Sequence, residues 1–198
     1  MRASLKGTLL FVASLAVSAG AWAHGAESGV AHQEASFWQG MLHPLTGVDH
    51  LAAMLVVGLW SATTAGRLWV APLAFANFLL AGAILGLSGF GLPVVEPMIA
   101  ASLLVLGLLV STRQQLPSLA GAALVGGFAL FHGIAHGQEL AVGTHWLAPL
   151  LGMLASTVAL HIVGVVTGLV LRERSLWWSR AAGALVAVLG TALLAQMA

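Results

Sequence analysis

The chain has 198 residues, of which 60% are hydrophobic and only 7% are charged, and its mean hydropathy is +1.00. Soluble proteins carry charge on roughly a quarter of their residues, so this composition excludes a soluble domain and indicates an integral membrane protein. The chain has no cysteine, no ATPase phosphate-binding loop of the Gly-x-x-x-x-Gly-Lys type and a formal net charge of only +1, so we expect no disulfide, no thiolate ligand, no ATP hydrolysis and no nucleic-acid partner.

The N-terminal segment has the pattern of a secretory signal peptide. Arg2 and Lys6 precede an apolar run at positions 9–19, and the small-residue motif Ala-Trp-Ala ends at Ala23. The run is shorter than the roughly 20 residues that a spanning helix needs, which disfavours the alternative of an uncleaved anchor. We therefore expect a cleaved signal peptide at 1–23 and a solvated periplasmic tail at 24–40.

Six apolar stretches follow in the remainder of the chain. They lie at 42–63, 68–87, 92–111, 119–136, 146–171 and 176–197. Each is long enough to cross a hydrocarbon core of about 30 Å at about 1.5 Å per residue. The predicted fold is therefore all-α, a polytopic bundle of six transmembrane helices at 41–198.

The basic residues predict the orientation of this bundle. Arg67, Arg113 and the group Arg172, Arg174 and Arg180 fall in or beside alternate loops, whereas the other loops hold no lysine or arginine. The positive-inside rule makes the arginine-bearing loops cytoplasmic. We expect a bacterial inner-membrane protein whose mature N-terminus and C-terminus are both periplasmic.

The first apolar stretch opens with the motif HPLTGVDHLAAM, which carries His43, Asp49, His50 and Met54. Ionisable groups at the mouth of a membrane span are costly and usually functional, so we interpret this motif as a site. In a regular helix, His43 would stand about 10 Å from His50 along the axis, too far for one ion with bonds near 2 Å. His43 is then an entrance ligand or a capping residue, and Met54 is more often a packing residue.

The fourth stretch ends with the motif FHGIAHGQE. His132 and His136 are four residues apart on one helical face, a spacing that suits a divalent metal, and Glu139 follows. Two hydrogen bonds between helices would explain the histidines equally well. However, His50 should lie roughly 12 Å deep and the fourth-stretch histidines within about 10 Å of the same outer surface, so the two motifs should be level.

Two more ionisable residues interrupt the apolar stretches. Glu96 begins the third stretch at a similar outer height to Asp49, and no lysine or arginine is predicted on that side. Buried carboxylates need a compensating cation, unless both are protonated. His161 should lie about 20 Å below the outer surface, either as a second ion station or as an interhelical hydrogen-bonding residue. His145 is expected to be a solvated loop residue.

These motifs, with the run Leu-His-x-x-Gly at 160–164 and the early glutamate of the third stretch, resemble the HupE/UreJ family of membrane proteins, which is associated with hydrogenase and urease maturation. The resemblance extends over nearly the whole mature chain. It implies a six-span nickel permease, with cobalt as a further substrate. The residues that match the family's motif positions are His43, Asp49, His50, His132, His136 and Glu139.

The expected function is therefore ATP-independent uptake of a divalent metal ion, Ni2+ first and Co2+ or Zn2+ as alternatives, for supply to nickel-enzyme maturation proteins. Histidine and carboxylate ligands suit all three ions. The expected partners are the ion, the lipid bilayer and those proteins, with no prosthetic group and no catalytic residue. Three alternatives stay open: a metal chaperone or sensor that does not transport, a b-type haem protein, and a metal-dependent intramembrane enzyme.

Overall fold

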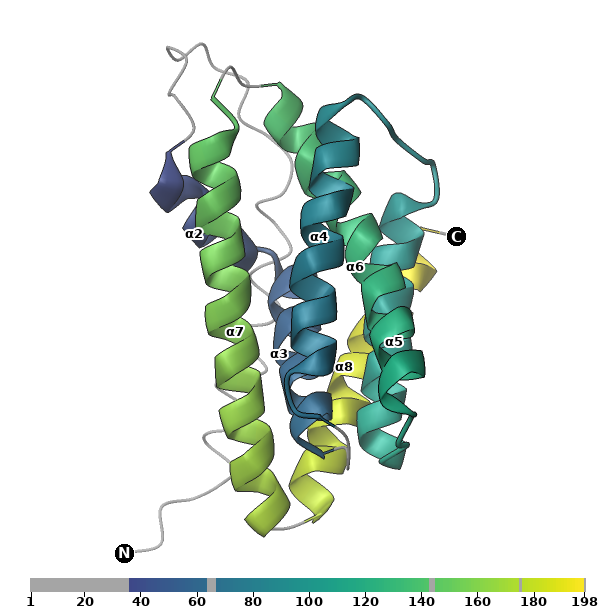
Figure 1. The fold of residues 1–198 in the computed structure, drawn as a ribbon. Coiled ribbons are helices and arrows are strands. Elements are labelled where there is room, and N and C mark those ends of the chain that lie inside the picture. The colour runs from purple at the N-terminus through teal and green to yellow at the C-terminus, as the bar shows by residue number, and fades with distance from the viewer. Residues whose placement is uncertain (1–35, 64–66, 143–144, 175, 198) are drawn as a thin grey trace, which may run out of the picture. The chain divides into compact units, whose positions relative to one another are not determined.

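The computed structural model describes residues 36–63, 67–142, 145–174 and 176–197. All of these belong to one compact unit, Glu34–Ala198; the other unit, Met1–Gln33, lies outside the described residues, as do the expected signal peptide and most of the expected tail. Regular structure in the described part is entirely helical, which confirms the all-α fold class (Figure 1). The helices are α2 (Phe37–Thr46), α3 (Val48–Thr63), α4 (Val70–Leu87), α5 (Val95–Thr112), α6 (Ser118–Ala141), α7 (Leu147–Arg174) and α8 (Leu176–Gln196).

Helices α4 to α8 are each long and apolar enough to cross a membrane. Helices α2 and α3 pass the same test only as a pair, and they are bent by 83° at the break between them. The described chain thus has five complete spans, or six if the bent pair counts as one. The protein is a multi-pass membrane protein, and the first predicted span is a pair of helices with a sharp bend between them.

The residues around the break between α2 and α3 explain why the helix stops and restarts there. Ser36 and Gln39 form a capping box that starts α2, with hydrogen bonds of 2.8 and 3.2 Å. Pro44 lacks a backbone N–H, and α2 ends two residues later at Thr46. Gly47 has extended backbone angles (φ −85°, ψ 113°), so the helical path stops there before α3 begins.

Glycines set how closely the helices pack. On α6, a Cβ at Gly133 would lie 2.8 Å from the backbone nitrogen of Ala83, and one at Gly137 would lie 2.8 Å from Gly86 Cα. Gly58 on α3 has a similarly close neighbour in Val165 of α7, 2.8 Å from the Cβ position. These approaches leave no space for side chains, which is the small-residue packing expected of helices in lipid.

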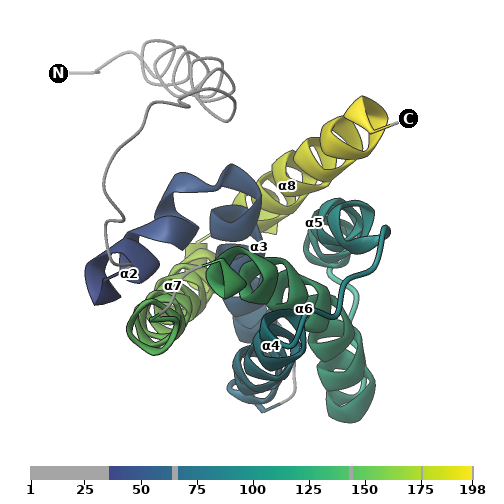
Figure 2. The ribbon, with the colours of Figure 1, turned by 90° about the horizontal axis from the view of Figure 1, so that it is seen from above.

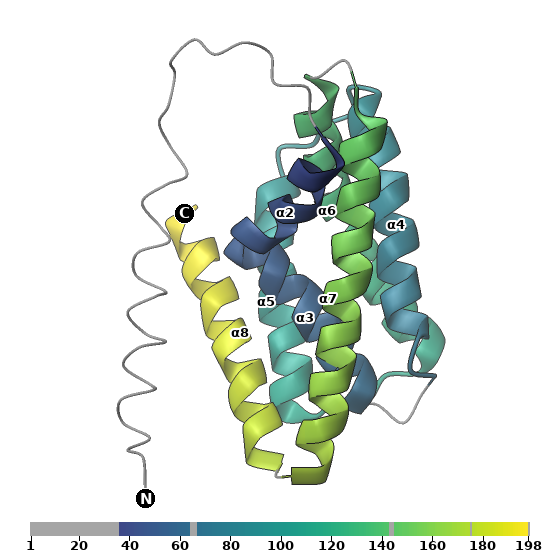
Figure 3. The same cartoon turned by 90° about the vertical axis from the view of Figure 1, so that its left-hand side faces the viewer.

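The helices alternate in direction. Helices α3, α5 and α7 end at the same side of the structure at which α4, α6 and α8 begin (Figure 1). The described arginines lie in those loops and adjoining turns, so they gather at one side, which we call the arginine end. Viewed from above and from the left (Figures 2 and 3), α2 crosses α7 near the opposite end, and α8 packs beside α5.

Candidate metal centre

Four histidines from three helices meet near the end opposite the arginines. His50 of α3 has its ring centroid 4.4 Å from that of His136 and 5.2 Å from that of His132, both on α6. His43 of α2 lies 5.0 Å from His136. The structure thus places the two sequence motifs side by side, although they are more than 80 residues apart in the chain. We call His43, Asp49, His50, His132, His136 and Glu139 the histidine cluster.

The bend at Gly47 brings His43 into this cluster. The expectation that about 10 Å separates His43 from His50 is wrong, because it assumed a continuous helix; the two ring centroids are 6.2 Å apart. Gly47 is also adjacent to the pair that follows it: a Cβ there would lie 3.1 Å from Asp49 Oδ1 and 3.2 Å from His50 Nδ1. A residue with a side chain would therefore crowd both groups.

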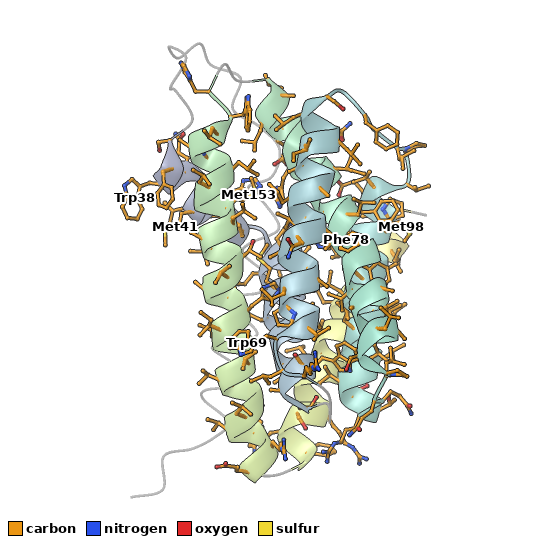
Figure 4. All side chains as sticks on the ribbon, in the orientation of Figure 1. Trp38, Met41, Trp69, Phe78, Met98 and Met153 are labelled. Atoms are coloured by element: carbon orange, nitrogen blue, oxygen red, sulfur yellow. The ribbon has the colours of Figure 1, made fainter. Side chains whose placement is uncertain are left out.

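One carboxylate oxygen joins the outer part of the cluster. Glu139 Oε2 lies 3.1 Å from His43 Nε2 and 3.4 Å from His136 Nδ1. One ligand atom from each of these three residues lies within 4.8 Å of the others, an arrangement that a small side-chain movement would convert into a metal site. His43 and Glu139 are half-exposed, and they line a cavity of ≈ 270 Å³ together with Gln39, Gly40 and Met153. Figure 4 labels Met153 on α7 and shows Trp38 projecting from α2, away from α7.

The deeper histidines have their Nδ1 atoms engaged and their Nε2 atoms free. His50 Nδ1 lies 2.9 Å from Asp49 Oδ1, and His132 Nδ1 donates to the backbone carbonyl of Phe128 at 3.0 Å. The Nε2 atoms of His50, His132 and His136 are buried and have no hydrogen-bond partner. A ring that donates through Nδ1 presents a lone pair at Nε2, as metal-binding histidines do. Each unpartnered buried group costs about 1–3 kcal/mol, a penalty that a bound cation would remove.

His161 lies apart from the cluster, on α7. Its side chain is buried, and its Nε2 also has no hydrogen-bond partner. The ring of Phe75, from α4, contacts both His161 and His132: its centroid is 5.0 Å from that of His161 and 5.5 Å from that of His132. Sequence reasoning gave Phe75 no role, because a phenylalanine in an apolar helix carries no signal beyond packing.

The remaining predicted residues lie elsewhere. Glu96 is exposed in the first turn of α5, whereas its neighbours Val95 and Ile99 pack against Ile134 of α6; the structure does not bring its carboxylate into the histidine cluster. His145 is exposed in the loop before α7. Met54 is fully buried in the apolar core, where packing accounts for it.

The charge around the cluster favours a cation. Asp49 and Glu139 contribute two carboxylates, and the arginines of the described segments lie at the arginine end. Two carboxylates beside imidazoles attract a divalent ion, more strongly at the partly buried Asp49 than at the half-exposed Glu139, where water screens the charge. The ligand set of imidazole and carboxylate suits Ni2+, Co2+ and Zn2+.

The chain is similar to known proteins over most of its length. Residues 11–193 match the family described as HupE / UreJ protein, a range that contains the whole histidine cluster. The chain is similar to Protein HupE of Rhizobium leguminosarum bv. viciae, with 40% identity over 157 residues that cover 78% of this chain and 82% of that protein. No solved structure matches the chain.

Proposed function

Because the chain belongs to the HupE/UreJ family of membrane proteins, we propose that it takes up a divalent transition metal ion across the bacterial inner membrane without ATP, with nickel as the physiological ion. Cobalt and zinc are further candidates, since the same ligands bind them. The receivers of the ion would be nickel-enzyme maturation proteins, in keeping with the hydrogenase and urease accessory character of the family.

One observation carries this proposal: three histidines on α3 and α6 direct unpartnered Nε2 atoms into a buried region beside two carboxylates. A structural role would leave these nitrogens hydrogen-bonded, since buried polar groups are normally satisfied. An ion that binds and leaves accounts for both their burial and their lack of partners.

The arrangement suggests a route. The ion first meets His43, Glu139 and the Nδ1 side of His136, where the side chains are still partly exposed. His136 is in ring contact with His50, which in turn contacts His132, so a chain of imidazoles leads inward. Beyond them, Phe75 is in ring contact with both His132 and His161, whose Nε2 is the next available nitrogen.

The membrane potential provides a sufficient driving force. If the arginine end is cytoplasmic, as the positive-inside rule indicates, the histidine cluster opens to the periplasm. A divalent ion that moves inward gains about 4.6 kcal/mol per 100 mV, equivalent to roughly a thousandfold accumulation. No coupled ion is required.

Uptake of radioactive nickel by cells that express the protein tests the proposal. We expect His50→Ala, His132→Ala and His136→Ala each to abolish accumulation while the protein still inserts into the membrane; His145→Ala, which lies outside the cluster, should accumulate nickel normally. Normal accumulation by all three cluster variants would refute transport through this site. Nickel binding by the purified protein without uptake by cells would favour a membrane chaperone or sensor.

The geometry does not favour the haem alternative. Two axial histidines must lie on opposite faces of a porphyrin, which separates their rings widely. Ring centroids 4.4 and 5.2 Å apart leave no room for a macrocycle between His50 and either α6 histidine. A colourless purified protein would agree with this reasoning.

A further inference from the structure

Between His161 and the arginine end, the route proposed above reaches Trp60 on α3. Gly58 on α3 packs against the backbone of α7 at His161, so the two residues are level. Trp60 follows half a turn farther toward the C-terminus of α3, and its side chain is buried, with 3% of it exposed. An ion that leaves His161 toward the arginine end must therefore pass the level of this indole.

The indole is held on two sides. Its Nε1–H donates to the backbone carbonyl of Gln114 at 3.0 Å, and Gln114 follows the left-handed residue Arg113 (φ 57°) that ends α5. On α6, Gly121 faces the six-membered ring so closely that a Cβ there would lie 2.7 Å from Cη2. Trp60 thus fills the space between α3, the end of α5 and the beginning of α6.

Trp60 borders both a small cavity and the apolar core. The cavity of ≈ 20 Å³ is lined by Ser61, Arg67 and Ser118 besides apolar residues, and it has room for about one water molecule. Trp60 also belongs to the same apolar core as Phe75 and Ala129. A cation cannot cross this core with its water, because desolvating a charge in apolar surroundings is costly.

We propose that Trp60 is the residue that closes the way from the buried histidines to the arginine end, and that its indole must move aside for an ion to leave. The inference rests on the proposed transport function. To move, the indole must release the Gln114 carbonyl and slide away from Gly121, so that the polar cavity and the core become continuous. Trp60 then controls the rate of release and the exclusion of hydrated ions, without binding the ion itself.

The test uses purified full-length protein, both in detergent for nickel binding and in lipid vesicles that contain dyes for Ni2+ and Mg2+. Removing the barrier with Trp60→Ala should leave nickel affinity within about twofold of the wild type and raise the Mg2+ leak by roughly tenfold or more. Trp60→Phe keeps a ring but loses the bond to Gln114, so its leak should be intermediate. The matched control is Trp178→Ala, whose side chain is exposed on α8, and its leak should equal that of the wild type.

The outcomes separate the two hypotheses. The role of Trp60 is overturned if Trp60→Ala protein binds nickel normally and its Mg2+ leak is unchanged. It is also overturned if that protein binds nickel normally but passes both Ni2+ and Mg2+ more slowly than the wild type. If Trp60→Ala does not fold, a Trp60→Phe leak equal to that of the wild type overturns it. Failure of the wild-type protein to bind or pass nickel is instead a failure of the proposed function.

Discussion

Replacing Gly133 by alanine tests how strongly the proposed metal site depends on the packing of α4 against α6. The new Cβ would lie 2.8 Å from Ala83 N and 2.9 Å from Gly82 Cα, and closer still to the carbonyl oxygen of Leu79. All three are backbone atoms, so no side-chain rotation relieves the overlap. The helices must separate by roughly 1 Å to restore ordinary van der Waals distances.

Such overpacking costs about 1–3 kcal/mol of folding free energy. For a chain of this length, that loss lowers the melting temperature by roughly 2–10 °C. Gly133 follows His132 directly, so the displacement also reaches the cluster, where ligands must be held within about 0.5 Å of their productive positions. We therefore expect nickel affinity to fall by about tenfold or more.

The assay combines thermal unfolding and nickel calorimetry on protein purified in one detergent. Gly127→Ala is the matched control, because it makes the same change on the same helix at a position with nothing within 4 Å of the new Cβ. Its stability should be unchanged or raised by up to about 1 kcal/mol, since alanine favours helix over glycine. Equal melting temperatures and equal affinities for the two variants would show that close packing at Gly133 does not support the site.

Three further predictions concern the histidine cluster and His161. Asp49→Ala should lower nickel affinity by about 10- to 100-fold, because His50 loses the hydrogen-bond partner of its Nδ1. Asp49→Asn can still accept that hydrogen bond, so its nickel affinity should fall less. Equal losses of affinity in the two variants would mean that the carboxylate binds the ion directly. His43→Gln and Glu139→Gln should slow nickel association, measured by stopped flow, while the stoichiometry is kept; a lost binding equivalent would instead place both residues in the tight site. His161→Ala should retain nickel binding in detergent but lose flux into vesicles, and loss of binding would contradict its position apart from the cluster.

Much of the architecture could be predicted because lipid imposes simple rules. The apolar stretches from Leu68 onward each correspond to a helix, α4 to α8, since only helices satisfy their own backbone inside a bilayer. The level placement of His50 and His136 followed from rise per residue and alternating direction alone. Gly133 and Gly137 allow the close packing of α6 on α4, because their Cα atoms lie against the backbone of α4.

Other features depend on three-dimensional detail that spacing does not contain. The first apolar stretch was expected to form one continuous helix, and nothing in its sequence determines an 83° bend, which decides whether His43 reaches His136. For Glu96, the sequence does not indicate which face of α5 points toward the histidines, because apolar residues occur on every face of that helix. The contact between Phe75 and two histidines arises only from how α4 packs.

Because α3 is short, the lipid bilayer affects access to the cavity that His43 and Glu139 line. Its 16 residues extend about 24 Å, less than the roughly 30 Å of an average hydrocarbon layer, and α2 turns away instead of completing the crossing. Where α3 is not covered by other helices, the mismatch is relieved by local thinning of the lipid or by water that enters from that end. Acyl-chain length therefore determines how deeply His43 and Glu139 lie in the bilayer. A thicker membrane would cover the cavity that they line without any change of sequence.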